Sequence, residues 1–394
     1  MSLGVMHRQV LTLAIAQAIF QTASTLVMTV GGLAGMRLAG SPALATLPIA
    51  TMFLGTALMT FPASMWMARV GRRPGFVVGA LLGVAGGLIA AFGIWSDSMP
   101  LLSFGTFLVG TYQAFAQFYR FAASEIASDG FRPRAIALVL AGGIVAAFAG
   151  PWLARVGGPL VDPAFVGSFL LLALVSLLGA GTLLMLHVPP PVAEGETDRG
   201  RPWRAIVSQP AYLAALFGAV TGYGIMILAM AATPIAMVAH QHPLSDAATV
   251  IQLHVLGMFV PSFFSGSLIV RFGARPVMLA GIVILTGHVL ATMTGTGFLS
   301  FASALVLLGV GWNFLYVGGT TLLTTTYTSA ERGRAQATND MTIFAVGLGC
   351  SFGAGALLDL LGWQRLNLIL LPWLAAAALV LIWQELRARH SRLH

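Results

Sequence analysis

Arg69-Val-Gly-Arg-Arg-Pro74 recurs in the second half of the chain as Arg271-Phe-Gly-Ala-Arg-Pro276, with the first Arg, the Gly, the last Arg and the Pro unchanged. A second motif, Arg132-Pro-Arg-Ala-Ile-Ala137, recurs as Arg332-Gly-Arg-Ala-Gln-Ala337. Each copy lies between two apolar stretches. Because similar halves place corresponding loops at a constant separation, the two repeats predict a duplicated chain.

The composition is typical of an integral membrane protein, since 58% of the 394 residues are hydrophobic and only 8% are charged. A soluble domain has far more charged residues. A helix needs at least about 18 apolar residues to cross a bilayer, and we find twelve such stretches. They cover residues 10–36, 43–68, 74–95, 99–123, 134–157, 164–187, 208–239, 246–270, 276–296, 299–328, 335–358 and 363–384. The sequence therefore predicts an all-α membrane protein of twelve transmembrane helices.

The longest polar connection follows the sixth apolar stretch and is rich in Pro, Glu and Arg. It predicts an N-terminal six-helix half (1–187), a cytoplasmic linker (188–207) and a C-terminal six-helix half (208–394). The cationic residues are all Arg and follow the positive-inside rule when both termini are cytoplasmic. This pattern predicts a multi-pass membrane protein with both termini cytoplasmic and excludes a nucleic-acid-binding patch. Cys350 stands alone, which excludes an internal disulfide.

The first loop motif resembles that of the major facilitator superfamily, whose signature after the second helix ends Asp-Arg-x-Gly-Arg-Arg. Arg69, Gly71, Arg72 and Arg73 match it, whereas the acidic position is Ala68. The resemblance covers the whole chain. It implies two pseudo-symmetric six-helix halves that expose a central site alternately to each side of the membrane.

The missing acidic residue puts the family's gating contact in doubt, and two other carboxylates near helix ends are candidates to replace it. We expect Glu125 to pair with Arg69 and Asp340 to pair with Arg271. The alternative is that these interfacial charges stay solvated, since exposed ion pairs contribute little. The arginines of the predicted charge network are Arg69, Arg73, Arg271 and Arg275.

Two residue pairs at helical spacing stand in the predicted seventh and eighth helices, Met226 with Met230 and His254 with Met258. Counting from the helix ends places Met230 and His254 both ~15 Å below the outer surface. The spacing of four puts each pair on one helix face, with Cβ atoms ~5–6 Å apart. Thioether sulfur and neutral imidazole suit Cu(I). The four residues are therefore a candidate site for a soft metal ion.

Packing is the alternative for these residues, because Met often fills gaps in cores and His often ties neighbouring helices together. Against it, an ionisable side chain at the middle of the membrane is costly and is a functional hypothesis by default. Met237, His240 and His242 cluster near the predicted outer mouth and are candidate entry ligands. Their alternative is a polar loop with interfacial histidines.

Met226-Ile-Leu-Ala-Met230 followed by His254-Val-Leu-Gly-Met258 resembles the CcoA-like copper importers of bacterial inner membranes, a branch of the superfamily. The resemblance implies a secondary transporter that imports copper by alternating access and supplies the assembly of haem-copper cytochrome oxidase. Copper is then a transported substrate, as Cu(I), and no resident cofactor is expected. A periplasmic copper donor and a cytoplasmic copper chaperone are candidate partners, and we expect a monomer in the lipid bilayer.

A small organic solute is the alternative substrate, because amides and aromatic rings suit hydrogen bonding and stacking in a pocket. The residues concerned are Gln17, Gln21, Tyr112, Gln113, Gln117, Trp312, Asn313 and Tyr316. No Asp or Glu stands near the middle of the first, fourth, seventh or tenth predicted helix, so the sequence indicates no proton relay there. A copper-binding sensor is a weaker alternative. An enzyme is not expected, since the chain lacks a CxxC motif and a nucleotide-binding glycine loop.

Overall fold

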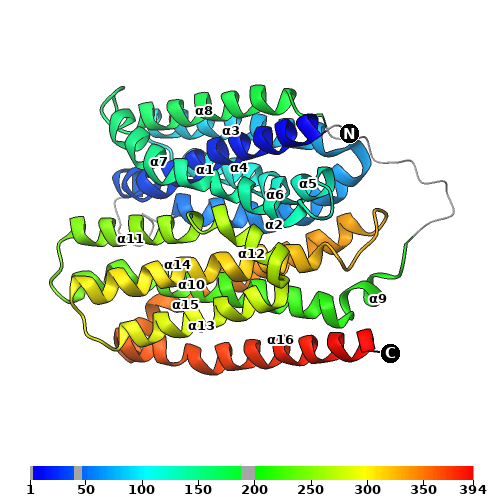
Figure 1. Ribbon diagram of the computed structural model, residues 1–394. Coiled ribbons are helices and arrows are strands. Elements are labelled where there is room, and N and C mark those ends of the chain that lie inside the picture. The colour runs from blue at the N-terminus through cyan, green and yellow to red at the C-terminus, as the bar shows by residue number, and fades with distance from the viewer. Residues whose placement is uncertain (1–2, 40–46, 188–199, 394) are drawn as a thin grey trace. The chain divides into compact units, whose positions relative to one another are not determined.

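The computed structural model describes residues 3–39, 47–187 and 200–393, and within them every regular element is an α-helix (Figure 1). The first eight helices are α1 (Leu3–Ala39), α2 (Leu47–Val70), α3 (Arg72–Trp95), α4 (Met99–Ala116), α5 (Tyr119–Ile126), α6 (Arg132–Ala141), α7 (Gly143–Gly157) and α8 (Val166–Leu184). The others are α9 (Trp203–Val207), α10 (Pro210–Ala239), α11 (Leu244–Phe259), α12 (Ser262–Phe272), α13 (Ala274–Thr292), α14 (Phe298–Leu323), α15 (Arg332–Leu368) and α16 (Leu370–Leu393).

These helices form twelve spans, which confirms the predicted fold class. Ten helical stretches of the described residues are long and apolar enough to cross a membrane. One of them, Arg332–Arg387, is long enough for two spans, and the non-helical Gly362 within α15, with a φ of 72°, separates these two spans. The remaining span combines α4 with α5. The spans α4–α5, α6–α7 and α11–α12 are each interrupted, and α9 is a short connecting helix.

The chain divides into two compact units. Unit 1 comprises Met1–Ala127, Leu138–Asp198 and Arg332–Met341; unit 2 comprises Ser128–Ala137, Arg199–Glu331 and Thr342–His394. The sequence places the division in a linker over 188–207, of which 188–199 lies outside the described residues. The two units differ from the two halves predicted on either side of this linker, because each unit includes one short segment from the other half. The start of α6 belongs to unit 2, and the start of α15 belongs to unit 1.

Each unit is built around one central helix. In unit 1, α4 packs against α1, α2 and α3. Gly110 of α4 has no room for a Cβ because the Met52 carbonyl of α2 lies against it. In unit 2, α14 packs against α10, α11 and α13. Gly309 of α14 likewise has no room for a Cβ, because the backbone of His254 and Met258 on α11 lies against it. Small residues of this kind let membrane helices approach closely.

The repeated loop motif also repeats a backbone conformation. Gly71 precedes α3 with φ 96° and ψ 162°, and Gly273 precedes α13 with φ 90° and ψ 162°. Only glycine adopts these angles without strain. The glycine of the motif therefore turns the chain from one span into the next in both units.

Candidate functional site

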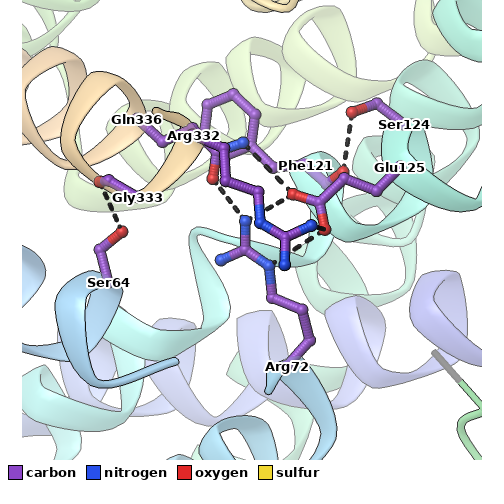
Figure 2. Close-up of polar contacts among 8 residues, drawn as sticks. All are labelled: Ser64, Arg72, Phe121, Ser124, Glu125, Arg332, Gly333 and Gln336. Carbon is purple, nitrogen blue, oxygen red and sulfur yellow. Dashed lines mark hydrogen bonds and ion pairs between the residues drawn. The ribbon is translucent and has the colours of Figure 1, made fainter. Parts of the chain in front are cut away.

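Four side chains of unit 1 form what we call the Glu125 cluster (Figure 2). Arg72 at the start of α3 donates from Nη2 to Glu125 Oε1 over 2.6 Å and from Nε to Oε2 over 3.3 Å. Its Nη2 also lies 2.6 Å from Gln336 Oε1. From the start of α15, Arg332 Nη1 approaches Glu125 Oε2 at 3.4 Å and Gln336 Nε2 approaches Oε1 at 3.4 Å. The cluster therefore joins α3, α5 and the first turns of α15.

Two arginines compensate the charge of Glu125, because Arg72 and Arg332 both lie within hydrogen-bond distance of its carboxylate. A carboxylate removed from water needs such opposite charges and hydrogen bonds. The predicted pairing of Glu125 with Arg69 is wrong. Arg69 lies exposed in the last turn of α2, whereas the turn at Gly71 carries Arg72 into the buried interior.

A second ion pair lies deeper along α15. Arg120 Nη2 of α5 donates to Asp340 Oδ1 over 2.6 Å, and the two side chains are 2% and 1% exposed. Arg120 Nη1 also donates to the carbonyl and to Oε1 of Gln117, each over 3.1 Å. Asn339 donates to Asp340 Oδ1 over 2.8 Å. Asp340 Oδ2 is buried and has no hydrogen-bond partner among the described residues.

The predicted pairing of Asp340 with Arg271 is wrong as well, because Arg271 is an exposed residue in the last turn of α12, where its guanidinium stacks on Phe272. Sequence reasoning missed Arg120 as the partner. A signal for it was available: Arg120 stands inside a predicted span, and a charge buried there needs an opposite charge. Arg73 is exposed, and Arg275 lies 3.7 Å from Glu385, so neither belongs to the Glu125 cluster.

The four residues of the predicted copper site all lie in unit 2, with Met226 and Met230 on α10 and His254 and Met258 on α11. Met230 is half-buried and the other three are buried. His254 Nδ1 lies 2.9 Å from the Leu305 carbonyl oxygen of α14. This bond ties α11 to α14, as the packing alternative expects, while Nε2 is buried with no partner among the described residues. Metal binding by the four side chains stays a prediction.

The candidate entry ligands have other contacts. Met237 is fully buried in α10, and His240 caps the end of that helix through its backbone N–H. His242 Nε2 lies 2.8 Å from the Thr296 carbonyl oxygen, and its Nδ1 lies 3.7 Å from Asp246 Oδ2. These contacts favour the alternative of a polar loop with interfacial histidines.

Five rings of unit 2 form an aromatic cluster that sequence spacing did not reveal as a whole. Trp312 and Tyr316 stack on α14, with ring centroids 4.8 Å apart and planes at 17°. Phe259 of α11 meets Trp312 edge-on at 5.9 Å. Tyr223 of α10 lies 6.3 Å from Tyr316 and 5.4 Å from Phe344 of α15. Trp312 Nε1 is a buried donor with no hydrogen-bond partner among the described residues.

Three of the eight residues proposed for an organic solute, Asn313, Gln113 and Tyr112, instead contact neighbouring helices. Asn313 Nδ2 donates to the Met258 carbonyl and to Ser262 Oγ, each over 2.7 Å, where Pro261 interrupts the span. Gln113 accepts a hydrogen bond from Thr56 of α2 over 3.2 Å. Tyr112 packs edge-on against Phe20 of α1 at 5.3 Å. Gln17 and Gln21 contact one another within α1, and Gln117 accepts from Arg120.

Comparisons with known proteins all assign this chain to the same family. Residues 13–252 and 215–393 match the model of the Major Facilitator Superfamily. A riboflavin transporter of Brucella anthropi, RfnT, is 40% identical over 379 residues, which is 95% of each chain. An uncharacterized MFS-type transporter of Bacillus subtilis, YdeG, is 28% identical over 338 residues, covering 80% of this chain and 77% of the relative. The specific likeness to copper importers finds no support in these relatives.

Solved structures share the fold at low identity. FucP, a Major Facilitator Superfamily transporter in the outward conformation, aligns with a TM-score of 0.74 and 16% identity over 95% of this chain and 98% of its own. The human organic anion transporter MFSD10 aligns with a TM-score of 0.75 and 11% identity over 95% and 99%. A bacterial homologue of the iron transporter ferroportin aligns with 0.72 and 15% over 95% and 98%. At these identities the likeness concerns the fold alone.

Proposed function

Since this chain belongs to the Major Facilitator Superfamily, we propose that it carries a small planar organic solute of the riboflavin type across its membrane. The chain is a multi-pass membrane transporter and not an enzyme. The proposal concerns the substrate, and it rests on the similarity of this chain to RfnT. The identity of 40% extends over 95% of both chains.

The aromatic cluster of unit 2 supports the same class of substrate. Riboflavin presents a flat, uncharged isoalloxazine ring, and aromatic side chains bind such rings by stacking. Ring pairs contribute about 0.5–1.5 kcal/mol each beyond the area that they bury. Trp312 and Tyr316 present nearly parallel rings, and the unpaired Trp312 Nε1 is a donor for a ring nitrogen or carbonyl of the solute.

Copper receives less support as the substrate. The motif that favours it is short, and RfnT, which is 40% identical to this chain, is named a riboflavin transporter. We further propose that both termini lie in the cytoplasm of a bacterial cell and that the inner membrane holds the chain, on the evidence of the arginine-rich loops.

The test is exchange of labelled riboflavin in proteoliposomes, which does not depend on the direction of transport. Liposomes with purified protein are loaded with unlabelled riboflavin and diluted into labelled riboflavin. We expect transient accumulation of label, and we expect Trp312→Ala to raise the half-saturating concentration at least tenfold. Phe264→Ala is the matched control, because Phe264 is an exposed ring of the same unit outside the aromatic cluster.

Labelled Cu(I) in the same liposomes provides the competing measurement. Copper exchange that Met230→Ala abolishes, together with no riboflavin exchange, would overturn the proposal. Riboflavin exchange that is insensitive to Trp312→Ala would keep the substrate but remove the aromatic cluster from its binding site.

A further inference from the structure

Three half-buried residues in the middle of α10 form what we call the accessible stripe, which comprises Tyr223, Ile227 and Met230. Every other residue from 221 to 230 is buried. Spacings of four and three residues place the three side chains on one face of the helix. Tyr223 lies near the middle of α10, so the stripe begins near the middle of the span. Secondary transporters bind their solutes at this depth.

The accessible stripe differs from the fully exposed positions of the same helix. Leu213 and Ile235 are 49% and 56% exposed, as expected of side chains that face lipid. The stripe is only half-buried because α14 and α15 lie beside it, each with an aromatic ring near Tyr223. None of its three side chains carries a charge. The stripe is therefore a partly enclosed apolar surface, which suits the face of an uncharged ring system.

The ring of Tyr223 is held in place from three sides. A Cβ added to Gly347 of α15 would lie 2.8 Å from Tyr223 Cε1 and 3.0 Å from Cδ1, so the ring lies directly against the α15 backbone. Phe344 meets the ring edge-on at 5.4 Å, and Tyr316 of α14 lies 6.3 Å away. Any side chain at position 347 would push the ring away. Gly347 therefore fixes where the Tyr223 ring stands.

Tyr223 is the accessible member of the aromatic cluster. The other four rings are almost completely buried, with exposed fractions of 5% for Phe259, 4% for Trp312, 3% for Tyr316 and 5% for Phe344. A solute that stacks on the cluster therefore meets the Tyr223 ring, and the buried rings support that ring from within unit 2.

The length of the stripe selects among flat solutes. Met230 stands seven residues after Tyr223, roughly 10 Å along the helix axis, and Ile227 stands roughly 6 Å along it. Three fused six-membered rings span a length comparable with the whole stripe, whereas two fused rings reach Ile227 but not Met230. A thioether sulfur makes favourable contacts with an aromatic ring. A third ring therefore gains a contact that a two-ring compound lacks.

We propose that the accessible stripe recognises the ring system of the solute. Tyr223 stacks on one end of the ring system, Met230 contacts the other end through its sulfur, and Gly347 is the positioning residue for the Tyr223 ring. The inference rests on the proposed function and narrows it, because it assigns specificity to the three-ring system rather than to the ribityl chain. The class of substrate is then the flat, uncharged tricyclic compounds.

Binding to the purified protein in detergent tests the stripe without requiring transport. The fluorescence anisotropy of riboflavin, titrated with protein, gives the dissociation constant. We expect Tyr223→Leu to raise this constant about tenfold, because it removes a stacked ring and the area that the ring buries. Tyr223→Phe keeps the ring and should stay within about threefold of the wild type. The matched control is Phe264→Leu, which changes an exposed ring of the same unit and should leave the constant unchanged.

Competition between two analogues tests the length of the stripe on the wild type itself. Lumichrome has the three rings without the ribityl chain, and a ribityl-substituted lumazine has the chain on two rings. We expect lumichrome to displace riboflavin at about tenfold lower concentration than the lumazine does. Met230→Ala should weaken lumichrome by about threefold, the loss of one sulfur–ring contact, and leave the lumazine unchanged. A general disturbance of the fold would weaken both compounds alike.

A double-mutant cycle tests the positioning role of Gly347. Gly347→Ala should weaken riboflavin binding about as much as Tyr223→Leu does, because the new Cβ displaces the ring. The double variant Tyr223→Leu/Gly347→Ala should bind no more weakly than Tyr223→Leu alone, since no ring is left to displace. Gly349→Ala is the control on the same helix, because a Cβ at that position meets nothing within 4 Å. Additive losses in the double variant would assign Gly347 to helix packing.

Riboflavin binding that is unchanged in Tyr223→Leu, or a lumazine that competes as well as lumichrome, would each overturn the inference and leave riboflavin as the substrate. Failure of the substrate assignment looks different. The wild type would then bind no riboflavin but would bind lumichrome with the same dependence on Tyr223, which supports the stripe. A wild type that binds neither compound overturns both proposals.

Discussion

After α2 the chain turns at Gly71 and enters α3 with Arg72; after α12 it turns at Gly273 and enters α13 with Ala274. The two glycines have nearly the same backbone angles, so the two copies of the motif turn the chain alike. In unit 1 the residue after the glycine supplies a buried guanidinium that bonds to Glu125. In unit 2 the corresponding position carries a methyl group, and no such cluster can form there.

The second repeat differs in the same way. Arg332 and Gln336 at the start of α15 contact Glu125 in unit 1. At the start of α6, in unit 2, Arg132 pairs with the exposed Asp129 over 2.9 Å, and Ile136 stands where the other copy has Gln336. The fully buried Arg120–Asp340 pair and the Glu125 cluster therefore lie in unit 1, whereas the aromatic cluster lies in unit 2.

The largest effect should follow from breaking the Arg120–Asp340 pair on one side only. Arg120→Gln leaves a buried, uncompensated carboxylate, so we expect it to lower the free energy of unfolding by about 3–5 kcal/mol. Arg120→Gln/Asp340→Asn should recover most of that loss, because no charge remains unpaired. Thermal unfolding in detergent measures both. Equal losses in the single and double variants would show that the pair acts through packing rather than charge.

Removing the arginine that distinguishes the two copies should have the next largest effect. Arg72→Ala gives unit 1 the residue that unit 2 has, and Glu125 then keeps Arg332 and Gln336 as partners. We expect a loss of about 1.5–3 kcal/mol, the usual range for a hydrogen bond to a charged group. Thermal unfolding in detergent measures this loss, and a loss as large as that of Arg120→Gln would contradict the ranking.

Much of this contrast could not be predicted from the sequence, although the spans and the duplication could. Hydrophobic length is a local property of the chain, so apolar stretches predict helices wherever they occur. A partner across the fold is not local. Glu125 was assigned to Arg69, three residues away from its true partner, because the direction in which each arginine leaves the turn depends on the conformation of Gly71.

The same limit applies to the aromatic cluster and to the copper site. Trp312 and Tyr316 were recognised as candidates on one helix, but the rings of Tyr223, Phe259 and Phe344 come from three others. His254 matches a short metal-binding motif, which stays a prediction, and the partner of its Nδ1, the Leu305 carbonyl, lies on a helix that spacing along the chain does not reveal. Short motifs of this kind occur by chance in a chain with many methionines.

A smaller, pH-dependent effect is expected in unit 2. Glu331 is buried in the loop before α15, where the guanidinium of Arg201 donates to both of its oxygens over 2.7 Å. The hydrogen bond from Arg201 lowers the pKa of Glu331 from 4.5 to about 2. A lowered pKa stabilises the fold above the unfolded value of about 4.5, and this contribution disappears as the pH falls toward 2.

Glu331→Gln should therefore be less stable than the wild type at pH 7, and the difference should shrink below pH 4.5. Because Arg201 is 44% exposed, solvent screens the pair, and we expect about 1 kcal/mol. Unfolding temperatures of the two proteins between pH 7 and pH 3 test this. A difference that stays constant across this range would assign the effect to packing.

The smallest effect is expected at the first arginine of each motif copy. Arg69 and Arg271 both lie exposed in the last turn of their helices, α2 and α12. An exposed cation near a helix C-terminus contributes roughly 0.3–1 kcal/mol through the helix dipole, and salt reduces this further. Arg69→Gln and Arg271→Gln should therefore each change the unfolding free energy by less than about 0.5 kcal/mol in physiological salt. A loss at Arg69 comparable to that of Arg72→Ala would mean that Glu125 uses Arg69 after all, and the difference between the two copies would then not depend on the residue after the glycine.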